Sequence, residues 1–179
     1  MTNAWDVAED QMNKHDNGGL FVRLQNDGDK VVGVFVGDPL PREVVWTGEK
    51  YAEMNTPEAE RAAQDGKRPT LKVGINFYDL GDKSLKVYEM NVGTFKTLVK
   101  LRKKYGLDAW AFEVERQGAK GDPKTKYSIL PEHQLDDRQI DTIAHLELHD
   151  LSRRLGGKAA NDNCAQSTTR TDCHDDIPF

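Results

Sequence analysis

The pattern of apolar and polar positions predicts β structure near the start of the chain. Residues 20–25 alternate with the period of a strand that has one apolar face, and Asn-Asp-Gly-Asp at 26–29 is typical of a turn. A second strand follows over 30–37, where Gly33 indicates a bulge or bend of the kind that turns a barrel corner. A third short strand is expected over 42–48.

The next part of the chain switches between helical and β patterns. A short helix or a long loop is expected over 52–69, since Thr56 can cap a helix and Pro57 suits its first position. Residues 70–91 predict a hairpin that turns at Gly81. Its apolar face is expected to carry Leu71, Val73, Ile75, Phe77, Leu85 and Val87, and its opposite face Lys72, Asn76, Tyr78, Lys86 and Tyr88.

An amphipathic helix over 92–106 and a second hairpin over 109–131 complete this region. Short strands with a single helix between two hairpins predict a mainly β fold over 18–131. The expected fold is an antiparallel barrel like that of oligonucleotide-binding (OB) domains, with one inserted helix. A β-sandwich is the structural rival, but sandwiches seldom contain one helix at this place.

The flanking segments predict three further parts. Residues 1–17 are expected to be a polar N-terminal extension. Residues 132–155 predict a C-terminal helix, because an apolar stripe recurs at helical spacing over 136–155; it could pack on the barrel or pair with another chain. Residues 156–179 are polar and of low complexity, so a flexible, disordered acidic tail is expected there.

Charge is distributed unevenly along the chain. The net charge of −5 argues by itself against binding of nucleic acid. Residues 66–130, however, carry a net charge of +7. They lie between residues 1–65, with −7, and residues 131–179, with −5. A basic body between acidic ends is typical of a protein that binds a polyanion, although solvated surface charge can also segregate in this way. No secretory signal or bilayer-length apolar run is evident, so a cytoplasmic location without membrane contact is expected.

The residues expected to face outward include aromatic rings beside cations. Rings that stack on bases and cations that follow phosphates are what single-stranded nucleic acid requires. The alternative for each ring is burial in the core, and Trp46 in particular could be either. The candidate nucleic-acid-binding residues are Phe21, Arg23, Phe35, Trp46, Lys72, Asn76, Tyr78, Lys86 and Tyr88. The Lys100–Lys104 run could extend the phosphate path, but a solvated helix face is the simpler interpretation.

Enzymatic interpretations find little support in the sequence. His145 and His149 have the spacing of a metal pair, but the glutamate that a metalloprotease places next to the first histidine is missing. Cys164 and Cys173 match no compact zinc module, and no lysine accompanies the acid pair Glu113 and Glu115 as a nuclease site would need. We therefore expect no enzymatic activity, no metal and no cofactor.

The stretch from VVGVFVGDP through KVGINFYDL and KSLKVYEMNVGTFKTLVKLRKKYGLDAWAFEVERQG to TKYSILP resembles the single-stranded DNA-binding proteins of tailed bacteriophages. The resemblance covers roughly residues 18–131. It implies an OB barrel and non-enzymatic, sequence-independent coating of single-stranded DNA during phage replication, recombination and repair, in the cytoplasm of the host cell. Some members carry a cysteine cluster after the third strand; residues 47–69 contain no cysteine, so no zinc is implied here.

The last five residues are similar to the end of bacterial single-stranded DNA-binding proteins, in which an acidic tail closing on Ile-Pro-Phe docks replication and repair enzymes. The resemblance implies a partner-binding tip made of Asp175, Asp176, Ile177, Pro178 and Phe179. The expected partners are thus single-stranded DNA and replication or repair proteins. A second hypothesis is a protein-interaction adaptor that uses such a tip to capture host replication enzymes. The oligomeric state stays open.

Overall fold

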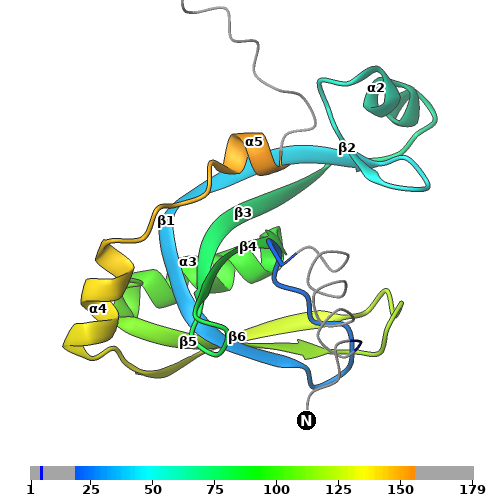
Figure 1. Ribbon diagram of the computed structural model, residues 1–179. Helices are drawn as coiled ribbons and strands as arrows, with labels where there is room; N and C mark the ends of the chain where they lie inside the picture. Colours follow the sequence, from blue (N-terminus) through cyan, green and yellow to red (C-terminus); the bar gives the residue numbers. More distant parts are fainter. Residues whose placement is uncertain (1–4, 6–18, 156–179) are drawn as a thin grey trace, which may run out of the picture.

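The computed structural model describes Trp5 and residues 19–155. Six strands form one antiparallel sheet in the order β4-β3-β1-β5-β6, and β2 pairs with the far end of β1 (Figure 1). The elements are β1 (Lys30–Trp46), β2 (Tyr51–Glu53), α2 (Pro57–Gln64), β3 (Thr70–Asp79), β4 (Ser84–Asn91), α3 (Val92–Tyr105), β5 (Trp110–Gln117), β6 (Lys126–Gln134), α4 (Asp137–Ala144) and α5 (Leu151–Leu155).

The order of elements is that of an open, OB-like barrel. Three strands follow one another as a meander (β1, β3, β4), a single helix comes next, and a final hairpin (β5, β6) returns to β1. β4 and β6 are the two ends of the described sheet, so the barrel is open between them. The predicted fold class is therefore confirmed, with an arm added between the first two barrel strands.

The long strand β1 is the spine of the sheet. It pairs with β5 over Lys30–Gly33 and with β3 from Gly33 onward, and its register shifts between Val36 and Leu40. The bulge expected at Gly33 therefore lies a few residues later, where Gly37 has a φ of +74°. Gly33 instead permits close packing, because a Cβ there would lie 2.3 Å from the Tyr78 carbonyl oxygen.

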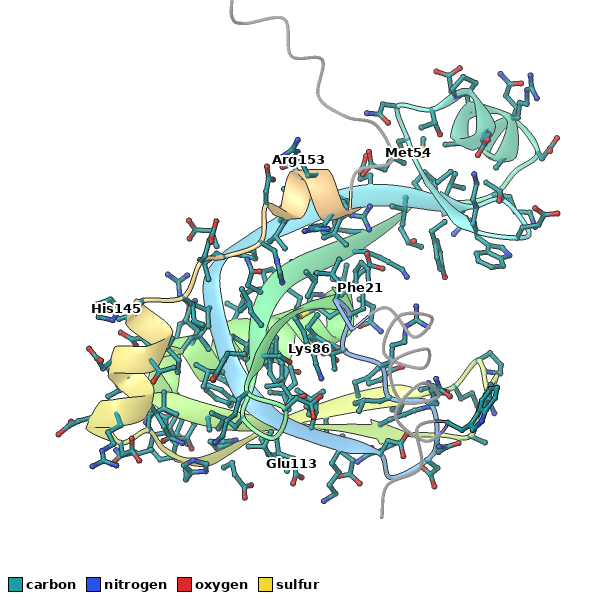
Figure 2. The ribbon with its side chains drawn as sticks, viewed as in Figure 1. Phe21, Met54, Lys86, Glu113, His145 and Arg153 are labelled. Carbon is teal, nitrogen blue, oxygen red and sulfur yellow. The ribbon has the colours of Figure 1, made fainter. Side chains whose placement is uncertain are left out.

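Two of the expected strands differ in the structure. Residues 42–46 are not a separate strand but the continuation of β1 beyond its bulge, and Pro39 lies inside that bulge, where no ladder hydrogen bond is lost. Residues 20–25 make only an isolated parallel bridge, between Phe21 and Val87. Phe21 is labelled in Figure 2. This segment runs along the free edge of β4, with Val22 N–H donating to the Val87 carbonyl at 3.0 Å.

The barrel core is built around aromatic rings. The ring centroids of Phe35 and Phe77 are 5.0 Å apart, and Tyr88 and Phe112 lie about 6 Å from Phe35. Leu98 of α3 is 2% exposed and belongs to this core, so α3 closes one end of the barrel. Asn91 caps the start of α3, with its side chain accepting from Thr94 N–H, and Gly106 caps its end.

A second layer covers the outer face of the sheet. The single helix expected over 136–155 is two short helices, α4 and α5, joined by an extended segment (Figure 1). In that segment, His149 is hydrogen-bonded to Asn76 of β3 and to the Leu85 carbonyl oxygen of β4. Ile143 of α4 packs with Val34 and Tyr78, and Leu151 of α5 is buried. Residues 137–155 therefore pack on the barrel of the same chain.

The arm comprises residues 40–69: the far end of β1, β2, α2 and their connections. It has a small core of its own, in which Val45 and Ala52 pack against Ala59 and Ala62 of α2. Thr56 caps α2 and Pro57 is its first residue, as predicted.

None of the helices within residues 19–155 has both the length and the apolar character needed to cross a membrane.

Candidate nucleic-acid interface

The two aromatic residues at the end of the arm form an exposed pair. Trp46 of β1 and Tyr51 of β2 are register partners, and their rings meet edge to face at a centroid distance of 5.0 Å. Trp46 is 41% exposed and Tyr51 is 48% exposed. They flank a tight turn in which the Thr47 hydroxyl donates to the Lys50 carbonyl at 2.9 Å. We call this pair the aromatic platform.

A cation lies against the aromatic platform. The Lys72 Nζ is 3.7 Å from the centroid of the Tyr51 ring, within the range of a cation–π interaction. Lys72 belongs to β3, where it pairs with Arg42 of β1 on one side and Asn91 of β4 on the other. Its outward orientation was predicted from the alternation of the strand, and the structure confirms it.

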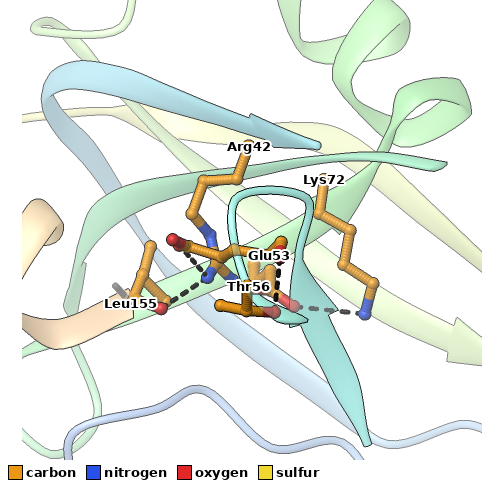
Figure 3. Close-up of polar contacts among 6 residues, drawn as sticks. Arg42, Glu53, Thr56, Lys72 and Leu155 are labelled. Carbon is orange, nitrogen blue, oxygen red and sulfur yellow. Dashed lines mark hydrogen bonds and ion pairs between the residues drawn. The ribbon is translucent and has the colours of Figure 1, made fainter. Parts of the chain in front are cut away.

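Ion pairs tie this lysine to its neighbours. Glu89 of β4 accepts from the Lys72 Nζ at 3.1 Å with one carboxylate oxygen and from Arg42 with the other. Arg42 also donates to Glu53 at 3.1 Å and to the carbonyl oxygen of Leu155 (Figure 3). The cluster of Arg42, Glu53, Lys72 and Glu89 therefore connects the arm, the sheet and the end of α5.

The aromatic platform belongs to the arm, which stands between β1 and β3, where an OB domain has the loop between its first two strands. Such domains use the face of their second and third strands, here β3 and β4, together with the loop between the first and second strands, here the arm. A hollow of about 260 Å³ opens beside Tyr51 and Lys72. Its other lining residues include Val22, Tyr88, Glu89, Asn91 and Tyr127.

Two aromatic residues expected on the outer face lie inside the barrel. Phe35 is opposite Phe77 in the ladder between β1 and β3 and is 2% exposed. Tyr88 is opposite Ile75 and is 4% exposed. The predicted faces of β4 were reversed, because the hairpin register aligns Tyr88, and not Val87, with the core side of β3. Burial raises the pKa of the Tyr88 hydroxyl well above its ordinary value, and the charge of Tyr127 acts in the same direction.

Two other candidates point outward but are covered. Tyr78 packs with Val34 and Ile143 beneath α4 and is 9% exposed. Asn76 is 3% exposed because its amide is hydrogen-bonded to the backbone of His149, donating to the carbonyl and accepting from the N–H. The alternation of the strand predicted their direction correctly. The alternation carried no information on residues 137–155, which cover both side chains.

Lys86 is engaged by carboxylates. Its Nζ lies 2.7 Å from an Asp79 oxygen and also pairs with Asp82. Burial alone would lower the pKa of Lys86, but the hydrogen bonds and charges of Asp79 and Asp82 outweigh it and raise the pKa. Lys86 therefore serves the β3–β4 turn in this structure, and the expectation of an outward cation ready for phosphate is corrected.

The remaining candidates lie on accessible parts of the molecule. Arg23 is exposed and Phe21 is partly exposed, both on the segment beside β4. Arg23 lines a hollow with Lys30 and Lys86, separate from the hollow beside Tyr51. The structure thus brings Trp46 and Lys72 into one region and places Phe21 and Arg23 along the neighbouring strand edge.

Sequence reasoning missed Tyr51 and Glu89 as members of this region. Tyr51 could have been found from Thr47-Gly48-Glu49-Lys50, a turn-forming stretch that sets Tyr51 opposite Trp46 in a hairpin. Glu89 has no comparable signal, because its contact with Arg42 depends on the pairing of strands far apart in the sequence. The expected tip, Asp175 to Phe179, lies outside the described residues.

Residues 19–155 and Trp5 contain no group of three or more histidine, cysteine, aspartate or glutamate side chains placed to hold a metal ion. Cys164, Cys173 and His174 lie outside that range. Comparison of the chain with protein-family models, with curated proteins and with solved structures found no match. The candidate interface therefore rests on geometry and charge.

Proposed function

We propose that this protein binds single-stranded DNA without sequence preference, and that the aromatic platform with Lys72 is the centre of the binding surface. The observation that carries the proposal is the exposed Trp46–Tyr51 pair with a lysine ammonium 3.7 Å above the Tyr51 ring. Stacking of a base on an aromatic side chain contributes about 1–3 kcal/mol and tolerates every base, since each has a π-face.

Charge supports the same proposal. Residues 66–130, which include β3, β4 and α3, carry a net charge of +7 within a chain of −5. Lys67 and Arg68 are exposed on the connection between α2 and β3, at the base of the arm. Cations near a stacking surface draw in the phosphate backbone and make binding sensitive to salt.

The proposed biological role is protection of single strands during phage DNA replication, recombination and repair, with the tip at Asp175–Phe179 recruiting replication or repair proteins. This role is non-enzymatic and belongs to the cytoplasm of the host cell. It extends the resemblance of the sequence to phage single-stranded DNA-binding proteins.

The test is a titration of fluorescent oligo-dT at low salt with wild-type protein and the variants Trp46→Ala and Tyr51→Ala. Each variant should weaken binding by about 5- to 150-fold, the loss of one stacking contact. Leu130→Ala is the matched control: Leu130 is a 53% exposed apolar residue of β6, and its removal should leave affinity unchanged. Absence of wild-type binding at low salt would overturn the proposal and favour the adaptor hypothesis.

A further inference from the structure

Glu89 lies within the proposed binding surface, against two of its cations. Its two carboxylate oxygens contact Lys72 and Arg42, and the same Lys72 ammonium lies over the exposed Tyr51 ring. A carboxylate held between two cations beside a stacking ring has the charge and hydrogen-bonding pattern of a nucleotide phosphate beside its base.

The two cations differ in how firmly the rest of the protein holds them. Arg42 is 14% exposed and has two further acceptors, the Glu53 carboxylate at 3.1 Å and the Leu155 carbonyl oxygen. Lys72 is 23% exposed, and within the described residues Glu89 is its one carboxylate partner. An incoming phosphate could thus replace Glu89 at Lys72 while Arg42 stays anchored.

The geometry points to Glu89 as an internal competitor of phosphate that limits the affinity of the protein for single-stranded DNA. In the free protein, Glu89 neutralises Lys72 and holds its ammonium over Tyr51. In the complex, a phosphate of the strand takes over Lys72, and Glu89 keeps its contact with Arg42. This inference rests on the proposed function and adds a residue that opposes binding at the same site.

The test compares Glu89→Gln with wild-type protein in oligo-dT titrations over a range of salt concentrations. Glutamine keeps the shape of the side chain and removes its charge. We expect binding at low salt to tighten by about two- to fivefold, the range that exposed ion pairs contribute. The gain should shrink as the salt concentration rises, because screening weakens the effect of the charge on residue 89.

Glu113→Gln is the matched control. Glu113 is also a carboxylate paired with a lysine, Lys30 at 3.1 Å, and its loss changes the net charge by the same amount at a different place. An equal gain in Glu113→Gln would assign the effect to net charge and overturn the inference. Circular dichroism melting curves check that both variants are folded.

A double-mutant cycle with Lys72→Ala isolates the contact. In the Lys72→Ala background, Glu89→Gln should no longer change affinity, since the gain acts through Lys72. If wild-type protein binds oligo-dT but Glu89→Gln binds equally or more weakly, this inference is wrong and the proposed function stands. If wild-type protein does not bind at all, both are wrong.

Discussion

At the scale of single residues, strand register decides which aromatic rings a ligand can reach. Trp46 and Tyr88 are both aromatic residues of strands, yet one is 41% exposed and the other 4%. Tyr88 is opposite Ile75, so its ring joins the barrel core, whereas Trp46 is opposite Tyr51 at the end of the arm. The predicted role of Tyr88 as a stacking ring is therefore replaced by a role in packing.

The buried hydroxyl of Tyr88 should make stability depend on alkaline pH. Its pKa is higher in the folded protein than in the unfolded chain, where tyrosine ionises near pH 10. The contribution of Tyr88 is therefore complete below about pH 10 and is lost above it, by about 1.4 kcal/mol per pH unit. Urea unfolding from pH 8 to 11 should show a smaller alkaline loss for Tyr88→Phe than for wild-type protein. Parallel curves for the two proteins would contradict this expectation.

At the scale of elements, the C-terminal segment is held to the sheet by a few specific contacts. The Asn76 amide pairs with the backbone of His149 much as a neighbouring strand would, at 3.1 and 3.2 Å, and the His149 ring contacts the Leu85 carbonyl. Gly74 leaves room for Leu155, since a Cβ there would lie 2.1 Å from its side chain. These contacts explain why the predicted continuous helix is divided into α4 and α5.

Asn76→Ala should loosen this segment while the barrel stays intact. The change leaves the N–H and carbonyl of His149 without their partners, which costs about 1–3 kcal/mol. Hydrogen exchange should accelerate at the amides of residues 149–155, with the β3 and β5 amides still protected. Asn91→Ala, which removes the cap of α3, is the control and should act on α3 instead. Equal acceleration throughout the barrel would refute a local role for Asn76.

At the scale of the whole molecule, charge is segregated along the chain. The basic stretch 66–130 precedes an acidic stretch, 131–179, whose net charge is −5. α5 ends where the Leu155 carbonyl meets Arg42, and Arg42 shares Glu89 with Lys72. The described structure therefore ends, at Leu155, close to the proposed binding surface.

Deletion of residues 170–179 should preserve or strengthen binding to single-stranded DNA. We expect the acids in this stretch to compete with phosphate for the basic stretch 66–130, and their removal should end that competition. Oligo-dT titrations at low salt would measure the effect. Replacing Asp172, Asp175 and Asp176 with asparagine is the control that keeps the length of the chain, and it should act in the same direction. Weaker binding by either variant would contradict the competition.

The sequence by itself determined the elements whose signals are local. Thr56 and Pro57 begin α2, Asn91 and Gly106 bound α3, and the two hairpins follow from alternation around glycine-containing turns. Caps and turns depend on residues within a few positions of one another, so they can be read from one stretch of chain. The order of these elements was enough to predict an OB-like barrel.

Only the tertiary structure decided which candidate side chains are accessible. Phe35 and Tyr88 are buried by the register between strands, and Asn76 and Tyr78 by the segment 137–155, which is distant in the sequence. The contact of Lys72 with Tyr51 and Glu89 likewise joins three strands. Alternation tells which residues share a face of a strand. What covers that face depends on long-range packing, because burial is a property of the neighbours that the fold brings together.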